Sequence, residues 1–309
     1  MILAREELAR AAPGGETALT VGVFDGVHRG HLYLLNRLQE QARALGLASG
    51  VVTLHPAPIQ VLHPEKRIAY LSSLEERIEL LRDAGVDFVA PVTFTSELAQ
   101  LSARDFVQLM EDELEVRFML EGPDHAVGRG REGTVAVLAE MGRDMGYQLE
   151  VLEALTEGEL VVSSTAIRSA LAEGSMRTVT ELLGRPFSLR GPVVEGAHRG
   201  KSIGFPTANI AVGVDRALPP FGVYVTRAYL GEARYKAVTN IGRRPTFDKG
   251  ERTIEVYLLD YRGDDFYGHD LRIELLDRLR PERRFAGADE LVAQIQRDVA
   301  AAEAALQED

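Results

Sequence analysis

The sequence predicts two domains of different fold class: an α/β domain with a Rossmann-like parallel sheet over residues 1–184, and a small antiparallel β-barrel domain with a C-terminal helix over residues 185–309. In the first half, strand-like runs alternate with helical patterns, which is typical of a parallel sheet covered on both faces. After Gly184-Arg185-Pro186, short strands follow one another through glycine- and proline-rich connections. That pattern is typical of a small antiparallel barrel or sandwich.

Strands and helices of the first half follow from apolar runs and from helix start and stop signals. Gly46 is placed to end one helix, and Ser73 with Glu76 forms a capping box for a second, which ends near Gly85. A third helix is expected to open at Ser102. The expected strands lie near Leu19–Phe24, Gly50–Leu54, Asp87–Val92, Arg117–Glu121, Gln148–Leu155 and Leu160–Ser163.

The second half reads as consecutive strands followed by one helix. Gly231-Glu232 is expected to form a tight hairpin turn. An apolar stripe at helical spacing predicts a closing helix from about Ala288 to Leu306. The expected strands are Phe187–Glu195, Gly222–Leu230, Ala233–Ile241, Thr253–Tyr261 and Leu271–Leu276.

Composition excludes several classes of function. The chain has 309 residues, no cysteine and a net charge of −12. Such a surface repels DNA and RNA, although a small anion such as ATP can bind where basic residues converge. Without cysteine there are no disulfides, thiol nucleophiles or thiolate metal sites. No signal-like start or membrane-spanning run is present in the sequence. We expect a cytoplasmic protein without nucleic-acid or membrane partners, and its composition suits a monomer and an assembly alike.

The segment from Val21 to His31 predicts a nucleotide-phosphate site. An apolar strand leads into a loop with His28 and His31 three residues apart, and a helix follows at once. In this geometry backbone N–H groups and the helix dipole face an anion, and two imidazoles can donate to phosphate oxygens. Gly26 and Gly30 allow backbone to approach a ligand closely. The alternatives are two solvated turn histidines, or a zinc site, which the lack of cysteine and of a third ligand disfavours.

A second motif lies at 198–209, where basic residues and glycines precede a rigid proline. Thr207 and Asn209 alternate in an extended segment, so both point to one side and can offer oxygen ligands to Mg²⁺. Arg199, Lys201 and the glycine backbone could hold substrate phosphates. The Gly-Lys-Ser order occurs here without the spacing or the strand-to-helix context of a P-loop.

Glu255 is the candidate general base of the second half. Phosphoryl transfer to an alcohol needs a group that accepts the hydroxyl proton. Glu255 is a carboxylate on an otherwise apolar strand, Thr253 to Asp260. Taken alone it is an outward-facing edge residue, but beside the Thr207–Asn209 motif it favours catalysis. The segment from Asn240 to Phe247 reads either as a nucleotide-facing loop or as a strand end with a turn.

Taken together, these motifs resemble the bacterial bifunctional riboflavin kinase/FAD synthetases. The resemblance covers nearly the whole chain, and the combination is more specific than any one motif. The matching segments are Gly22–His31, Ser163–Arg168, Gly204–Asn209, Phe221–Tyr224, Asn240–Phe247 and Glu255–Asp260.

This resemblance implies two ATP-dependent reactions. The second domain would phosphorylate riboflavin to FMN with Mg²⁺, using Glu255 as base and Thr207 and Asn209 as metal ligands. The first domain would join AMP from a second ATP to FMN and release pyrophosphate, with His28, His31 and Arg168 stabilising charge on the α-phosphate. The implied nucleotide-binding positions are Gly22, Phe24, Asp25, Gly26, Gly30, Ser163, Ser164, Thr165, Arg199, Gly200, Lys201, Gly204 and Asn240. The implied flavin-binding positions are Asp124, Phe205 and Tyr224.

The first domain departs from the family pattern at two places. Relatives commonly carry Thr-Phe-x-Pro-His-Pro after the second strand, whereas this chain has Ala57 at the histidine position and His55 two residues earlier. The Gly-x-Asp-Phe-x-Phe-Gly loop becomes Gly122 to Gly128 with His125 and Val127 in place of the aromatics. Two alternatives therefore stay open: a riboflavin kinase with a weakened adenylyltransferase domain, and a flavin-binding regulator without turnover.

Overall fold

A computed structural model describes residues 1–158, 160–196, 204–243 and 252–307. The chain divides into two compact units, Met1–Ser164 and Thr165–Asp309. The second unit begins earlier than the domain boundary expected at residue 185, since it includes α7 (Ser164–Glu173) from Thr165 onward and α8 (Met176–Leu183). Helix α8 packs against the barrel strands β10 and β15, which accounts for this grouping.

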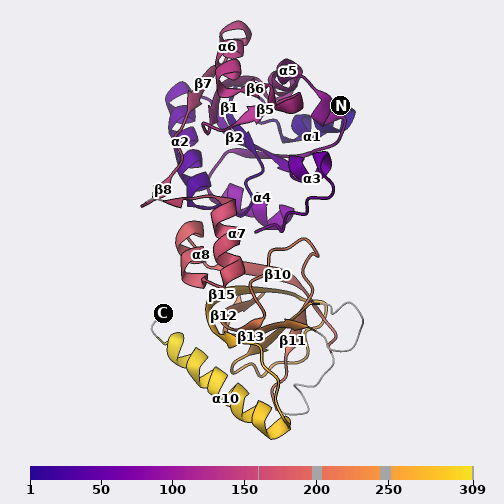
Figure 1. Cartoon of the computed structure of the whole chain (residues 1–309). Coiled ribbons are helices and arrows are strands. Elements are labelled where there is room, and N and C mark those ends of the chain that lie inside the picture. The colour runs from indigo at the N-terminus through magenta and orange to yellow at the C-terminus, as the bar shows by residue number, and fades with distance from the viewer. Residues whose placement is uncertain (159, 197–203, 244–251, 308–309) are drawn as a thin grey trace. The chain divides into compact units, whose positions relative to one another are not determined.

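A five-stranded parallel sheet forms the centre of the first unit, as predicted (Figure 1). Its order is β3-β2-β1-β4-β7, and every neighbouring pair is parallel. The run near Leu160 lies outside this sheet, because β8 (Thr156–Glu157) and β9 (Leu160–Val161) form a small hairpin of their own. The sheet strands are β1 (Thr17–Gly22), β2 (Ala48–His55), β3 (Phe88–Thr93), β4 (Val116–Glu121) and β7 (Gln148–Val151).

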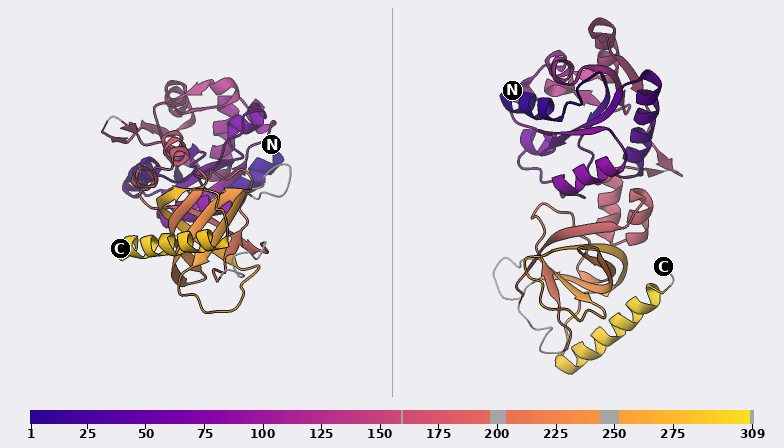
Figure 2. Two further views of the ribbon diagram at one scale, coloured as in Figure 1. Left: turned by 60° about the horizontal axis from the view of Figure 1, so that its bottom comes forward. Right: turned by 180° about the vertical axis from the view of Figure 1, so that it is seen from behind.

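Helices cover both faces of this sheet (Figure 2). Side chains alternate along β1, so Leu19 and Val21 pack toward α1, α5 and α6, whereas Ala18 packs toward α2 and α4. Helix α1 has no counterpart among the sequence-based expectations. The helices are α1 (Ile2–Ala11), α2 (Arg29–Leu45), α3 (Pro58–Leu62), α4 (Leu74–Asp83), α5 (Ala103–Leu114) and α6 (Val135–Met145). A second short hairpin joins β5 (Ala126–Val127) to β6 (Gly133–Thr134).

The predicted helix signals of the first unit have the expected geometry. The Ser73 hydroxyl accepts from the Glu76 amide at 3.1 Å, and the Glu76 carboxylate accepts from the Ser73 amide at 2.7 Å. Gly46 ends α2 with φ of 71°, a left-handed conformation that costs glycine little. The capping box and the glycine stop are therefore both confirmed.

Six antiparallel strands close into a barrel in the second unit, in the order β10-β11-β14-β13-β12-β15. Gly231-Glu232 forms the turn between β12 and β13, as predicted. The region around Asn209 was predicted to be an extended segment. In the structure it is strand β11, which closes the barrel between β10 and β14. The strands are β10 (Phe187–Val194), β11 (Ala208–Ile210), β12 (Gly222–Leu230), β13 (Ala233–Arg243), β14 (Arg252–Leu258) and β15 (Asp270–Pro281).

The C-terminal helix α10 (Ala288–Ala305) packs on the outside of the barrel. Ala302 and Leu306 are buried against Val223 and Val238 of β12 and β13. Among the described residues, no helix combines the length and the apolarity needed to cross a membrane.

A partly buried ion pair joins α10 to the barrel, and we expect it to stabilise the second unit. Arg280 of β15 donates to both carboxylate oxygens of Asp298, with its shortest contact at 2.7 Å. Asp298→Ala leaves the guanidinium without this partner, so we expect the free energy of unfolding to fall by about 2 kcal/mol. Glu303→Ala on the exposed side of α10 is the matched control and should change it by less than about 0.5 kcal/mol in urea denaturation.

Candidate active sites

The loop after β1 has an unusual backbone and is fastened at several points. Phe24, Gly26 and Val27 all have positive φ, at 53°, 80° and 38°. The amide of Gly26 donates to the Ser72 hydroxyl at 3.0 Å, and the Thr53 hydroxyl donates to the Val23 carbonyl at 3.1 Å. The surrounding structure therefore holds the loop in a conformation that is uncommon for side-chain-bearing residues.

His28 and His31 begin α2 as a reciprocal cap. The His31 amide donates to Nδ1 of His28, and the His28 amide donates to Nδ1 of His31, each at 3.3 Å. The two rings stack with centroids 3.6 Å apart and planes at 17°. Because each Nδ1 accepts a hydrogen bond, the proton of each neutral imidazole lies on Nε2. Both histidines can therefore offer an Nε2–H donor at the N-terminus of a helix, where an anion is favoured.

Two glycines allow this pair to pack closely. A Cβ on Gly30 would lie 2.9 Å from the Val162 carbonyl oxygen and 3.1 Å from Nδ1 of His28. A Cβ on Gly22 would lie 2.9 Å from the Phe24 ring. Phe24 is buried, and the centroid of its ring lies 5.0 Å from that of His31. Gly22, Phe24 and Gly30 were predicted to contact nucleotide, and the structure places them in support of the histidines.

Asp25 has a structural role that the sequence-based assignment to nucleotide binding does not include. Its carboxylate is only 4% exposed and accepts from the amides of Leu71 at 2.9 Å and Ser72 at 3.1 Å. The Ser164 hydroxyl donates to the Asp25 carbonyl at 2.9 Å, so Ser164 is also used within this loop. Asp25 thus ties the histidine loop to the segment that precedes α4.

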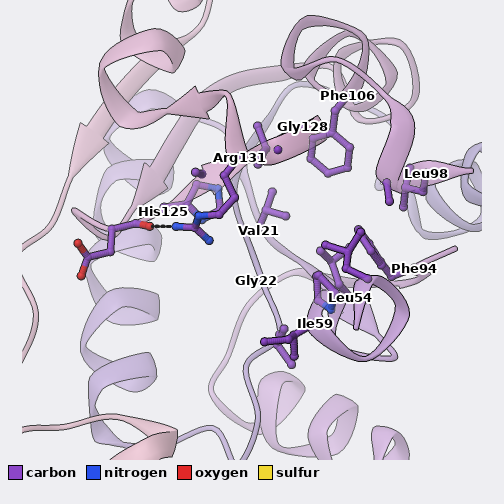
Figure 3. Close-up of a pocket in the computed structure, with 18 of the residues that line it drawn as sticks. Val21, Gly22, Leu54, Ile59, Phe94, Leu98, Phe106, His125, Gly128 and Arg131 are labelled. Atoms are coloured by element: carbon purple, nitrogen blue, oxygen red, sulfur yellow. Dashed lines mark hydrogen bonds between the residues drawn. The ribbon is translucent and has the colours of Figure 1, made fainter. Parts of the chain in front are cut away.

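A cavity of about 480 Å³ opens at the carboxyl ends of the parallel strands (Figure 3). Gly22 of β1 and Leu54 of β2 line it, together with Phe94 just after β3 and Phe106 of α5. Asp124, a predicted flavin contact, lines it from the loop after β4. The pocket thus begins where β1 runs into the histidine loop, and its walls are mostly apolar. Phe94 and Phe106 were not predicted from the sequence, because residues from separate elements carry no local pattern that marks a shared wall.

His125, in one wall of the cavity, contacts the buried acid Glu121. Nδ1 of His125 lies 3.1 Å from Oε2 of Glu121, and Oε1 of Glu121 accepts from the Val21 amide at 2.9 Å. Burial raises the pKa of Glu121 well above its usual value. Burial also lowers the pKa of His125 to about 4, with a further contribution from Arg131. The other departure, His55, packs its ring 5.4 Å from Tyr70 at the end of β2, while Ala57 is buried.

In the second unit, three predicted residues lie side by side on adjacent strands. Glu255 of β14 is directly opposite Asn209 of β11 on one side and Asn240 of β13 on the other. Directly opposed residues of antiparallel strands project from the same face, with Cβ atoms about 5 Å apart. Ile254 and Val256 on either side of Glu255 are buried, so this row lies on the outer face of the barrel. The structure therefore brings together a carboxylate and two amides.

The neighbourhood of this row includes aromatic side chains and a close backbone contact. Phe205, a predicted flavin contact, packs edge-on against Tyr257 at 5.4 Å, and Tyr257 shares a face with Glu255. A Cβ on Gly196 would lie 2.1 Å from Nδ2 of Asn209, so backbone covers that amide. Thr207 immediately precedes β11 and is partly exposed.

Tyr224 does not fit its predicted contact with flavin. Its side chain is 0% exposed, and its hydroxyl donates to the Pro220 carbonyl. Burial raises the pKa of this hydroxyl to about 12. The strand alternation that placed a tyrosine here directs it into the barrel core, so we leave Tyr224 out of the proposed site.

Several further residues were predicted from the sequence to contact nucleotide. Arg199, Gly200 and Lys201 lie outside the described residues. Gly204 is exposed, and Ser163 directly precedes α7. Thr165 and Arg168 lie on α7. Their proposed contacts with nucleotide stay predictions.

Comparison with known proteins gives a consistent assignment for both units. The FAD synthetase family matches residues 12–166, and the riboflavin kinase family (Flavokinase) matches residues 183–306. A bifunctional riboflavin kinase/FMN adenylyltransferase of Escherichia coli K12 is 40% identical over 289 residues, which are 93% of this chain and 92% of the relative. The Bacillus subtilis protein of the same description is 34% identical over 300 residues, covering 96% of this chain and 92% of the relative.

A solved structure agrees over nearly the full length. A crystal structure from Streptococcus pneumoniae, described as a macrolide-efflux protein, has a TM-score of 0.87 and 28% identity, covering 96% of each chain. The FAD synthetase match includes the histidine loop, and the riboflavin kinase match includes the Asn209–Glu255–Asn240 row. The chain therefore belongs to the family of bifunctional riboflavin kinase/FMN adenylyltransferases.

Proposed function

We propose that the barrel unit phosphorylates riboflavin to FMN and that the α/β unit converts FMN to FAD, each reaction using one ATP. The observation that carries this proposal is the presence of two separately built sites in one chain. One site pairs stacked imidazoles with a helix N-terminus, and the other sets Glu255 between two amides. We place both reactions in the cytoplasm because each consumes ATP.

In the kinase reaction, Glu255 accepts the proton of the riboflavin 5′-hydroxyl as its oxygen attacks the γ-phosphorus of ATP. The bond between the γ-phosphorus and the bridging oxygen breaks, and ADP leaves. Asn209 and Asn240 flank Glu255 on the two neighbouring strands, one on each side. Phe205, next to Tyr257, offers an aromatic surface for the flavin ring.

Thr207 and Asn209 fit a magnesium site by their chemistry. Asn209 is opposite Glu255 and Thr207 lies two residues before Asn209, so both offer neutral oxygens from one short segment, and Mg²⁺ prefers oxygen and keeps positions for substrate phosphates. When bound, Mg²⁺ would neutralise charge on the ATP phosphates. Within the described residues, no cluster of three or more acidic or histidine side chains competes for this role.

Thr207→Val tests this assignment while nearly preserving side-chain shape. Loss of the hydroxyl oxygen should raise the Mg²⁺ concentration for half-maximal riboflavin phosphorylation by roughly tenfold. Thr253→Val, on the same strand face as Glu255, is the matched control and should leave the Mg²⁺ dependence unchanged. Equal Mg²⁺ dependence in Thr207→Val and wild type would remove Thr207 from the metal site.

Adenylyl transfer needs no general base, because the FMN phosphate is already an anionic nucleophile. Its oxygen attacks the α-phosphorus of ATP, and pyrophosphate leaves. The Nε2–H groups of His28 and His31 can donate to phosphate oxygens as charge develops, and the N-terminus of α2 adds its dipole. The cavity of about 480 Å³ beside this loop is within the usual size range for a small-molecule site, and its aromatic and aliphatic walls suit a flat flavin ring.

Gly30→Ala should selectively impair the second reaction. The added Cβ would force the His28 ring or the Val162 carbonyl to move by a few tenths of an ångström. We expect FAD formation from supplied FMN to fall by about tenfold to a hundredfold, while riboflavin phosphorylation stays within about twofold. Gly15→Ala, where a Cβ meets nothing within 4 Å, is the control. A Gly30→Ala variant with full FAD formation would show that this close packing has no catalytic consequence.

ATP labelled at single phosphates tests the two-step proposal. With riboflavin and ATP carrying labelled γ-phosphate, label should appear in FMN and then in the phosphate of FAD next to riboflavin. With label at the α-phosphate, FMN should stay unlabelled and FAD should carry label next to adenosine. In a separate reaction, FMN is supplied with γ-labelled ATP and no riboflavin. The amount of labelled pyrophosphate released should then equal the amount of FAD formed. Any other distribution contradicts the assigned bond breakage.

A further inference from the structure

The Glu121–His125 pair is a polar feature in the otherwise mostly apolar wall of the cavity. Glu121, at the end of β4, is only 2% exposed and fixed by the Val21 amide. His125 lines the cavity (Figure 3). The exposed fraction of its side chain is 16%. At this position, as at Val127, the family pattern has phenylalanine. An imidazole here therefore needs a reason beyond filling the space.

Charge balance determines which hydrogens the pair carries. A net charge in a buried, apolar wall is costly, so the neutral pair is favoured. The neutral pair holds one proton between Oε2 of Glu121 and Nδ1 of His125, and a second proton on Nε2. Nε2 carries the second proton whether the first proton lies closer to Glu121 or to His125. Nε2 of His125 is therefore a hydrogen-bond donor.

That donor has no acceptor within the described residues. Nε2 of His125 is buried and makes no hydrogen bond, whereas Nδ1 is paired with Glu121. An unsatisfied buried donor is unfavourable unless a ligand supplies the acceptor. Arg131, which lines the cavity beside His125, is an exposed side chain whose guanidinium donates to the Asp124 carbonyl. Asp124 and His63 are the other titratable groups of this lining.

We propose that His125, oriented by Glu121, donates a hydrogen bond from Nε2 to the acceptor edge of the flavin ring of FMN. This contact selects FMN by a polar interaction at a place where the family pattern supplies an aromatic ring. The proposal rests on the proposed adenylyltransferase function of this unit. Wild-type conversion of FMN and ATP to FAD is therefore measured first, and its absence would overturn the function and this contact together.

Three substitutions at His125 separate contact with flavin from contact with Glu121. In His125→Gln, the amide nitrogen takes the place of Nε2 and keeps the donor. In His125→Asn, the amide takes the place of Nδ1, which keeps the Glu121 contact and removes the donor. His125→Phe removes both. Riboflavin phosphorylation by each variant reports whether the rest of the chain remains active.

We expect the three variants to differ in their KM for FMN in the adenylyltransferase reaction. His125→Asn and His125→Phe should raise it by about tenfold to a hundredfold, and His125→Gln by less than about threefold. The KM for ATP should stay within about twofold in all three. The reverse order, with Asn close to wild type and Gln impaired, would mean that His125 only positions Glu121. An unchanged KM in every variant, or loss of FAD formation in every variant, would equally overturn the proposal.

Histidine NMR of the wild-type protein provides a second readout, in which His125→Gln is needed only to assign the signal. The chain has seven histidines, and ¹⁵N labelling of histidine resolves their tautomers by NMR. The signal missing in His125→Gln identifies His125. We expect the Nε2–H tautomer, with an Nε2 shift that changes when FMN is added. An Nδ1–H tautomer, or a signal that FMN leaves unchanged, would contradict the contact.

Discussion

Glu255→Gln is expected to stop riboflavin phosphorylation while FAD formation from supplied FMN continues. The amide keeps the size of the side chain and its position between Asn209 and Asn240, but it cannot accept the proton of the 5′-hydroxyl. Removal of a general base costs about 10²–10⁴-fold, so we expect riboflavin phosphorylation to fall by about 10³-fold. Chromatographic separation of riboflavin, FMN and FAD measures both reactions in one sample.

The control for this variant is Glu232→Gln, at the exposed hairpin turn of the same barrel. It should leave both activities unchanged. If Glu255→Gln retains more than about a tenth of the wild-type kinase rate, Glu255 is not the base. If it loses both activities, the carboxylate supports the fold rather than one reaction.

His28→Asn should produce the opposite selectivity. Asparagine can still accept the His31 amide and is a favourable N-cap, so α2 keeps its start. The Nε2–H donor is lost, and removal of one donor to a developing charge costs about 10²–10³-fold. FAD formation from FMN should fall by that amount, and riboflavin phosphorylation should stay within about twofold. The urea midpoint of the first unit should stay close to that of wild type.

His28→Gln is the complementary variant, because its amide reaches toward the Nε2 position but cannot cap the helix in the same way. We expect it to retain more FAD formation than His28→Asn and to be less stable. The reverse ranking would show that His28 acts by capping α2 and not by contact with phosphate.

Local sequence patterns predicted the parts of the fold that local physics determines. The Ser73–Glu76 capping box, the Gly46 stop and the Gly231 turn each depend on a few neighbouring residues, and all three formed as expected. Strand β11 is only three residues long, and its pairing with β10 and β14 depends on strands distant in sequence. No periodicity can mark so short an element.

The candidate sites, like the fold, were predictable only where a local sequence pattern determines them. Histidines three residues apart at a strand-to-helix turn indicated the loop, and the register of β11, β13 and β14 brought Asn209, Asn240 and Glu255 together. Burial was not predictable from motifs, because Asp25 and Tyr224 have polar groups that bond to backbone inside the fold. The cavity walls depend on tertiary packing, which no segment encodes alone.

One time course tests the central claim that this chain carries both activities. Purified protein is incubated with riboflavin, ATP and Mg²⁺, and the three flavins are separated over time. We predict that FMN appears first, reaches a maximum and is then converted to FAD. FMN that accumulates without FAD would mean that the changes at Ala57 and His125 have removed adenylyltransferase activity. The absence of both products would contradict the account and favour a flavin-binding protein without turnover.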